Sequence, residues 1–143
     1  MRVIAALFLS SVVAFGSQVH GTNAAQTAYT ALNFSTPSRN IVCWASAPAS
    51  PSGDLVCVVL SSFGGAQDFP EGGYLPVRGR AAIRRESNAG DIEDSLRHTV
   101  PYGRVWRRGF LRCTSRRTGL TCVSSYGEGG HGFFLSRRTR RAW

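Results

Sequence analysis

The sequence predicts an all-β protein: a small sandwich or barrel-like domain of about seven short strands with two disulfides. Short runs rich in β-branched and aromatic residues are bounded by Gly, Pro and Ser, which is the pattern of short strands. Turn signals recur between these runs, at residues 64–65, 72–73, 101–103 and 127–130. The chain also holds four cysteines, an even number. Together these features favour two stacked sheets or a closed barrel over a helical fold.

Seven runs are the candidate strands. The first two, Ile41–Trp44 and Leu55–Leu60, are the richest in β-branched residues. A helix fits only residues 90–98, where Asp91 is the candidate N-cap. No internal repeat, heptad pattern or low-complexity segment is evident, and residues 137–143 are expected to fray. The other five candidate strands are Tyr74–Arg78, Arg104–Trp106, Phe110–Thr114, Thr121–Tyr126 and Gly132–Ser136.

The first residues have the layout of a secretory signal peptide. Arg2 supplies a positive charge, residues 3–15 form a largely apolar run, and small and polar residues follow up to Ala25. The alternative, a membrane anchor, needs roughly 18 apolar residues, and this run is shorter. We therefore expect residues 1–25 to be a signal peptide, cleaved after Ala24 or Ala25. Residues 26–143 then form a single secreted or periplasmic β domain, because the length fits one domain.

Four cysteines in an exported chain predict two disulfides. Cys43 and Cys57 lie in the first two candidate strands, on either side of a loop that contains Pro and Gly. Cys113 and Cys122 flank residues 116–119, and a four-residue loop there places the two cysteines directly opposite each other. Their spacings, C-x13-C and C-x8-C, differ from the C-x2-C pairs of zinc sites, so no metal is expected. We predict bridges 43–57 and 113–122, each stabilising the fold by roughly 2.5–3 kcal/mol.

The charged residues are unusual in kind. All 17 basic residues are Arg and none is Lys, against 8 acidic residues, so the net charge is +9. Without an amine side chain the protein cannot perform Schiff-base lysine chemistry, form a Walker A phosphate loop or assemble an S-x-x-K acyl-enzyme site. Guanidinium groups bind phosphate or carboxylate through two parallel hydrogen bonds. The composition suits an anionic partner, but a solvated surface whose charge only keeps the protein soluble is the simpler interpretation.

The candidate binding residues come from one arginine cluster and one Gly-rich loop. They are Arg104, Trp106, Arg107, Arg108 and His131. We expect a non-enzymatic binding or envelope-associated module, without a cofactor, whose partner is an anionic polymer or a component of the cell envelope. Other large aromatic side chains are expected in the core: Phe34, Trp44, Phe110, Phe133 and Phe134.

Catalysis is the alternative hypothesis. With a Glu and an Arg, either His98 or His131 could serve a small secreted hydrolase of the phosphodiesterase or ribonuclease type. No spacing defines such a site, so no catalytic residue is assigned. Residues 127–132 spell G-x-G-x-x-G, but a strand rather than a helix is expected after them, which argues against a dinucleotide-binding fingerprint. A third hypothesis, a periplasmic inhibitor of a cell-wall hydrolase, fits the size and the bridges but suits the basic charge badly.

Four segments of the chain carry recognisable motifs. Residues 34–43 match the pattern F-x-[ST]-P-S-x-N-I-x-C, and residues 100–103 are similar to L-P-Y-G. Residues 113–122 are similar to C-x-S…G-x-T-C, and residues 130–137 to G-H-G-F-x-L-S-R. Together these motifs resemble those of a family of small exported bacterial proteins, a family of unknown function common in actinobacteria and rhizobia. The motifs occur in the family's order and bracket residues 34–137. The resemblance implies an exported disulfide-containing domain, and it implies no activity, ligand or catalytic residue.

Overall fold

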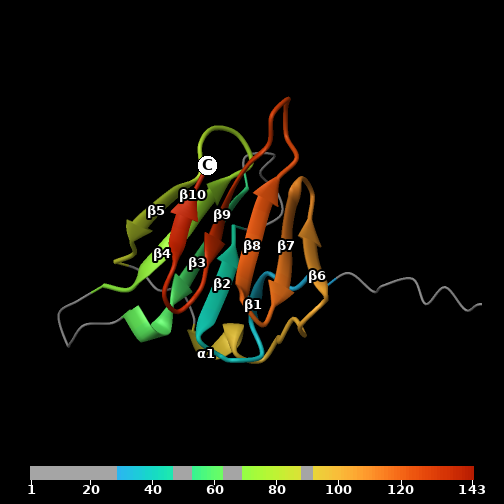
Figure 1. The fold of residues 1–143 in the computed structure, drawn as a ribbon. Helices are drawn as coiled ribbons and strands as arrows, with labels where there is room; N and C mark the ends of the chain where they lie inside the picture. Colours follow the sequence, from blue (N-terminus) through green and yellow to red (C-terminus); the bar gives the residue numbers. More distant parts are fainter. Residues whose placement is uncertain (1–28, 47–52, 63–68, 88–91) are drawn as a thin grey trace, which may run out of the picture.

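Ten strands form two antiparallel sheets in the computed structural model, which describes residues 29–46, 53–62, 69–87 and 92–143 (Figure 1). The predicted signal peptide, residues 1–25, and the candidate N-cap Asp91 lie outside the described residues. The fold is all-β, as the sequence predicts. The two sheets pack face to face around one shared core, in the manner of a sandwich.

The first sheet has the strand order β1-β2-β3-β4-β5, so each strand pairs with the next one along the chain. A short 3-10 turn, Leu60–Ser62, follows β3, and a one-turn helix, α1 (Ile92–Ser95), packs against β1 and β2. The strands of this sheet are β1 (Asn33–Ser35), β2 (Ile41–Ala45), β3 (Asp54–Val59), β4 (Glu71–Pro76) and β5 (Ala82–Arg85).

The second sheet repeats this connectivity. Its order is β10-β9-β8-β7-β6, so its five strands again pair in succession. Counted along the chain, the disulfide of each sheet joins the second strand to the third: β2 to β3 in the first sheet and β7 to β8 in the second. The two halves therefore share one topology, although no repeat is evident in the sequence. The strands of this sheet are β6 (Val105–Arg108), β7 (Leu111–Arg116), β8 (Gly119–Ser124), β9 (His131–Leu135) and β10 (Arg140–Ala142).

The structure extends the predicted set of strands. All seven candidate runs overlap observed strands, but β1, β5 and β10 are not among the predictions. The expected fraying of residues 137–143 is wrong, because β10 is hydrogen-bonded to β9 and its Arg140 forms an ion pair with Glu71 of β4 at 3.0 Å. The helix expected at 90–98 is reduced to the single turn of α1 in the described part of that segment.

Both predicted disulfides are present. Cys43–Cys57 joins β2 to β3, and Cys113–Cys122 joins β7 to β8. In each pair the two residues are direct partners across a hairpin, with Cα atoms 4.0 and 4.1 Å apart. The register predicted for the second hairpin is also confirmed, but the predicted four-residue loop at 116–119 is wrong, because Arg116 and Gly119 are themselves paired as the last residues of the two strands. All four cysteines are fully buried, so both bridges belong to the core.

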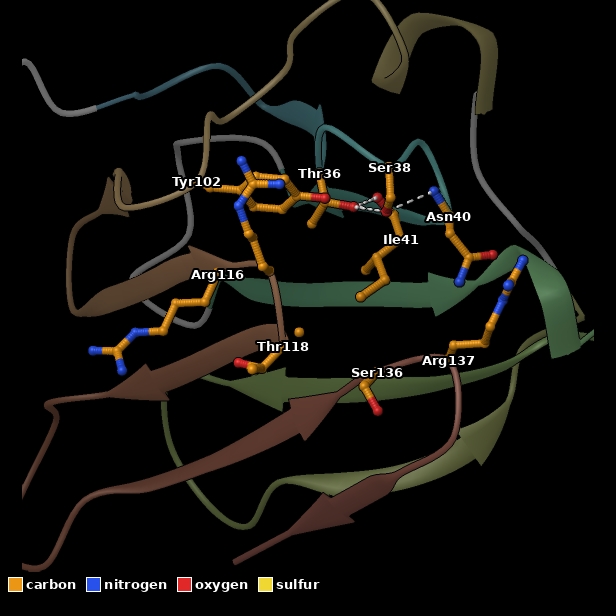
Figure 2. Close-up of a pocket in the computed structure, with 11 residues that line it drawn as sticks. Thr36, Ser38, Asn40, Ile41, Tyr102, Arg116, Thr118, Ser136 and Arg137 are labelled. Atoms are coloured by element: carbon orange, nitrogen blue, oxygen red, sulfur yellow. Dashed lines mark hydrogen bonds between the residues drawn. The ribbon is translucent and has the colours of Figure 1, made fainter.

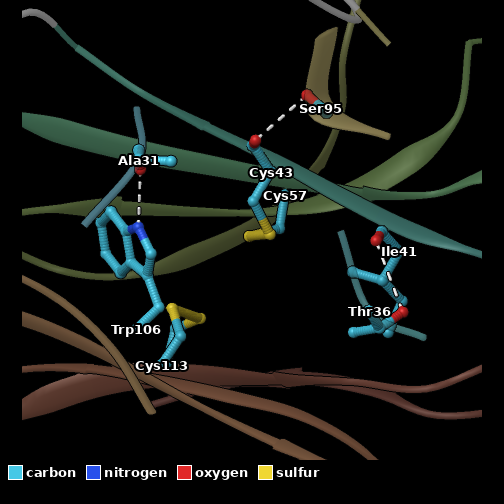
Figure 3. Close-up of a disulfide and its surroundings, with 9 residues drawn as sticks. Ala31, Thr36, Ile41, Cys43, Cys57, Ser95, Trp106 and Cys113 are labelled. Carbon is cyan, nitrogen blue, oxygen red and sulfur yellow. Dashed lines mark hydrogen bonds between the residues drawn. A yellow bond between two sulfur atoms is a disulfide. The ribbon is translucent and has the colours of Figure 1, made fainter. Parts of the chain in front are cut away.

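Two facing rows of side chains build the middle of the core. Phe34 at one end stacks on Trp106 with ring centroids 4.9 Å apart, and further along Gly73 lies against the ring of Phe133. The two disulfides occupy the positions between these contacts, and Figure 3 shows them with Trp106. In the first sheet the row is Phe34, Cys43, Cys57, Gly73 and Ile83. In the second sheet it is Trp106, Cys113, Cys122, Phe133 and Ala142.

The segment before β1 closes one edge of the sandwich. Tyr29 pairs with β6 of the second sheet: its N–H donates to the Val105 carbonyl at 3.2 Å, and its own carbonyl accepts the N–H of Arg107 at 2.9 Å. The chain then enters β1 of the first sheet at residue 33. On the way, the Ala31 carbonyl accepts the indole N–H of Trp106 at 2.7 Å (Figure 3). The segment therefore bridges the two sheets and covers Trp106.

The large aromatic residues divide between the core and the surface. Phe34 and Phe133 are fully buried, as predicted. Trp44 and Phe134 are only half-buried, because strand alternation turns them away from the shared core. The core prediction for Phe110 is wrong: this ring lies in the β6–β7 turn and is 49% exposed. Among the described residues, no helix is long and apolar enough to cross a membrane.

Candidate functional site

The structure does not gather the five predicted binding residues into one site. Trp106 is fully buried between the sheets, so neither face of its ring is open to a ligand. Arg107 follows it on the opposite, outer face of β6 and is exposed. Arg108 is half-buried, and its guanidinium donates to the Thr30 carbonyl at 3.4 Å. Arg104 is exposed in the turn before β6.

The two histidines have separate surroundings. His131 is half-buried at the start of β9, and its Nε2 lies 2.8 Å from the Pro76 carbonyl of β4, so the ring N–H donates a hydrogen bond to that carbonyl. Its cross-strand partner Ser124 donates to the Val77 carbonyl at 2.8 Å. Both side chains therefore tie the second sheet to the end of β4. His98 is exposed on the connection between α1 and β6.

A cleft of about 290 Å³ opens at the end of the sandwich where turns from both sheets meet (Figure 2). Four segments far apart in the sequence form it: the β1–β2, β7–β8 and β9–β10 turns and the turn before β6. Turns held by a rigid scaffold are a common position for binding residues. This cleft is lined by Thr36, Ser38, Asn40, Ile41, Tyr102, Arg116, Arg117, Thr118, Gly119, Ser136 and Arg137.

Short polar side chains of the β1–β2 turn form one wall of the cleft. The hydroxyls of Thr36 and Ser38 are hydrogen-bonded at 3.1 Å (Figure 2). The side-chain oxygen of Asn40 accepts the N–H of Ser61 at 2.9 Å, which directs its NH2 group away from that contact. Arg39 adopts a φ of 56°, and its N–H donates to the Thr36 carbonyl at 2.8 Å, which closes the turn. The wall thus offers hydroxyl and amide groups on a constrained backbone.

A tyrosine and an arginine of the second half form another wall. Tyr102 lies in a type II turn, since Gly103 has a φ of 81° and the Arg104 N–H donates to the Pro101 carbonyl at 3.0 Å. The guanidinium of Arg117, in the β7–β8 turn, lies over the Tyr102 ring, 5.2 Å from its centroid. Stacking of this kind holds the planar cation in place and leaves its in-plane N–H groups able to bind an anion.

A further arginine comes from the β9–β10 turn. The N–H of Ser136 donates to the Thr139 carbonyl at 2.8 Å, and its hydroxyl accepts the N–H of Thr139 at 2.9 Å. This tight turn presents Arg137, whose side chain runs toward the β1–β2 turn, whereas Arg116 points away (Figure 2). Arg117 and Arg137 are therefore the two cations best placed to meet a ligand.

Among the described residues, the lining is cationic, with three arginines and neither Asp nor Glu. The ion pairs seen among the described residues use Glu71, Glu86 and Glu93, and none of them involves a lining residue. Guanidinium, hydroxyl and amide groups together are the donors that recognise phosphate, sulfate or carboxylate. In the part of the chain that the structure describes, no group of His, Cys, Asp and Glu could hold a metal ion.

No family model, curated protein or solved structure matches this chain. Within the sequence, the arginine clusters do not identify the cleft, and its lining is spread over four short segments. Each of them supplies part of the lining: Thr36, Ser38 and Asn40 in 34–43, Tyr102 in 100–103, Arg117 in 113–122, and Ser136 and Arg137 in 130–137.

Proposed function

We propose that this chain is an exported, non-enzymatic binding module that holds an anionic group in the cleft. The lining carries the proposal: Arg117 and Arg137 lie with a wall of hydroxyl and amide groups, and no carboxylate is among the lining residues that the structure describes. Each guanidinium can bind phosphate, sulfate or carboxylate through two parallel hydrogen bonds. A volume of about 290 Å³ lies at the lower end for small-molecule sites and suits one charged sugar or nucleotide unit.

Action outside the cytoplasm is part of the proposal. It is supported by the signal-like residues 1–25 and by the two buried disulfides, which persist in oxidising compartments. In such a compartment the anion belongs to a small solute or to a component of the cell envelope.

Binding is favoured over hydrolysis by the chemistry of the lining. Acid–base catalysis needs a group within about 2.6–3.2 Å of the proton that it moves. The described residues of the lining include no imidazole, carboxylate or thiol. His131 lies against the Pro76 carbonyl, and neither His131 nor His98 is part of the cleft.

Titration of the isotope-labelled protein with small anions, followed by NMR, tests the proposal. The probes are inorganic phosphate, sulfate, galacturonate and glucose 1-phosphate. We expect saturable shifts of the amide signals of residues 36–41, 102, 117 and 137 with at least one probe. Arg137→Gln should weaken that binding about tenfold or more, because it removes a charge-assisted contact.

The matched control is Arg138→Gln, the exposed neighbour in the same turn, which removes the same charge outside the lining. Its affinity should equal that of the unmodified protein. Equal losses in both variants, or shifts that avoid the cleft, would overturn the proposal.

A further inference from the structure

The net charge of the protein belongs to its second half. Residues 1–95 contain six Arg and seven acidic residues, whereas residues 96–143 contain eleven Arg and one acidic residue, Glu128. All strands of the second sheet lie in this second part, so this sheet and its turns carry the positive charge. A field of one sign over one face of a protein attracts partners of the opposite sign.

Two rows of side chains cross the outer face of the second sheet, which is the face turned away from the shared core. One of these rows contains Arg107 and Arg112, which are direct cross-strand partners and are both exposed. Like charges directly opposite each other destabilise a sheet, and a bound anion removes that cost. The first row is Val105, Thr114, Thr121, Phe134 and Arg141. The second row is Arg107, Arg112, Val123 and Gly132.

Two aromatic rings lie against glycines on this outer face. A Cβ atom on Gly132 would lie 3.0 Å from Cζ2 of Trp143, and one on Gly119 would lie 2.8 Å from ring atoms of Phe134. Trp143 pairs with Gly132 through two backbone hydrogen bonds of 2.9 and 3.0 Å, and it is 50% exposed. The guanidinium of Arg141 lies 5.4 Å from the centroid of Phe134. The face thus combines aromatic surface, hydroxyl groups and cations.

The outer face of the first sheet has the opposite character. Arg84 forms an ion pair with Glu86 and lies over the ring of Tyr74, 3.9 Å from its centroid. The Tyr74 hydroxyl donates to Asp54 at 2.7 Å. Charges on the first sheet are therefore compensated within the protein. No ion pair among the described residues involves an arginine in the two rows of the second sheet's outer face.

We infer that the outer face of the second sheet binds an extended acidic polysaccharide, whose sugar units carry carboxylate or sulfate groups. A sugar ring has an apolar C–H face that packs on an aromatic ring and a hydroxyl rim that hydrogen-bonds with threonine. Guanidinium groups supply two-point contacts to the acidic groups. The central strands β7 and β8 carry Thr114 and Thr121 rather than aromatic rings, which favours a hydroxyl-rich chain over the stacked bases of single-stranded nucleic acid.

Binding of immobilised polymers by the whole protein tests this inference. The probes are polygalacturonate for carboxylate, dextran sulfate for sulfate, neutral dextran, oligo(dT), and vesicles of phosphatidylglycerol. We expect binding to one or both acidic glycans that weakens as the salt concentration rises. Arg107→Gln with Arg112→Gln should weaken it about tenfold, with no loss of thermal stability because the opposed charges are removed. Trp143→Ala should weaken it without any change in charge.

The control pair is Arg78→Gln with Arg80→Gln, which removes two exposed charges from the β4–β5 turn and should leave glycan binding within about twofold. Arg137→Gln, which tests the cleft, should also leave glycan binding unchanged, so that the cleft proposal and the present inference can be refuted separately. Equal losses of glycan affinity in the two double variants would show that binding depends only on net charge, and this would overturn the inference. Stronger binding to oligo(dT), to the vesicles or to neutral dextran than to both acidic glycans would overturn it as well.

Discussion

Replacing Gly73 by Ala tests how closely the two sheets fit together. An added Cβ would lie 2.5 Å from Cγ of Phe133 and 2.6 and 2.7 Å from its two Cδ atoms. Carbon atoms in contact are normally about 3.5–4.0 Å apart, so the ring or its strand has to move by about 1 Å. Both residues are direct cross-strand partners of disulfide cysteines, Cys57 and Cys122, which oppose such a movement.

The expected loss of unfolding free energy is about 2–3 kcal/mol, in the upper part of the range for overpacked cores. Phe133→Leu alone should cost about 1–2 kcal/mol, because the ring is lost from a fully buried position. In the Phe133→Leu background, however, Gly73→Ala fills space that the ring has vacated and should cost less than about 1 kcal/mol. The two substitutions should therefore couple by about 1.5 kcal/mol or more.

Urea denaturation of the four proteins in this double-mutant cycle measures the coupling. The control is Gly109→Ala, where φ is 53° and no atom lies within 4 Å of the added Cβ. It should cost about 1 kcal/mol from backbone strain alone, equally in both backgrounds. A cost for Gly73→Ala below about 0.5 kcal/mol, or one that does not change with Phe133→Leu, would refute the close fit.

Three further predictions concern stability. Replacing Cys113 and Cys122 together by Ser should lower the unfolding free energy by at least roughly 2.5 kcal/mol in urea denaturation, because the unfolded chain loses its loop constraint. The hydrogen bond to Asp54 raises the pKa of Tyr74 above 10.0. The stability that this hydrogen bond adds is therefore complete below pH 10 and is lost as the pH rises through the raised pKa of Tyr74. Tyr74→Phe should thus cost about 1 kcal/mol near pH 8, and a cost that persists unchanged in strong alkali would contradict this origin. Ser115→Ala should raise the unfolding free energy by about 1 kcal/mol, since its buried hydroxyl has no partner among the described residues; a lower melting temperature would count against it.

The two disulfide hairpins are predictable because the information for them is local. β-branched runs, turn residues and cysteines lie within short stretches of sequence. Counting outward from the loop at 116–119 is enough to set Cys113 opposite Cys122, and the observed register agrees. Strand alternation then turns both cysteines toward the core.

The short edge strands cannot be predicted from local sequence in the same way. β1 and β10 have three residues each, and the second half of β5 is two arginines, so their local patterns do not differ from those of loops. They form because a neighbouring strand offers its hydrogen-bonding edge. Trp106 shows a related difficulty. Its arginine neighbours indicate surface, but its pairing with Cys113 places the indole in the core.

The cleft exists only in the tertiary structure and has no local pattern in the sequence. Its walls come from turns on both sheets, and they meet only because the two rows of core side chains stack in one particular alignment. The sequence clusters many arginines and does not distinguish Arg117 and Arg137 from the others. Only the positions of the β7–β8 and β9–β10 turns in the folded protein place these two side chains in the cleft.

The shared topology of the two halves makes their differences informative. On the first sheet, the outward-facing Val42 and Val58 are fully buried, and α1 packs against β1 and β2 with Ser95 donating to the Cys43 carbonyl at 3.2 Å (Figure 3). The part of the first sheet's outer face formed by β1, β2 and β3 is therefore partly covered and leaves less surface for a partner. The outer face of the second sheet carries exposed arginines, and most of the described arginines that take part in none of the ion pairs seen in this part of the chain lie on that face or in the turns of that sheet. The two proposals therefore give an anionic partner two separate places to approach this molecule, the outer face of the second sheet and the end of the sandwich where the cleft lies.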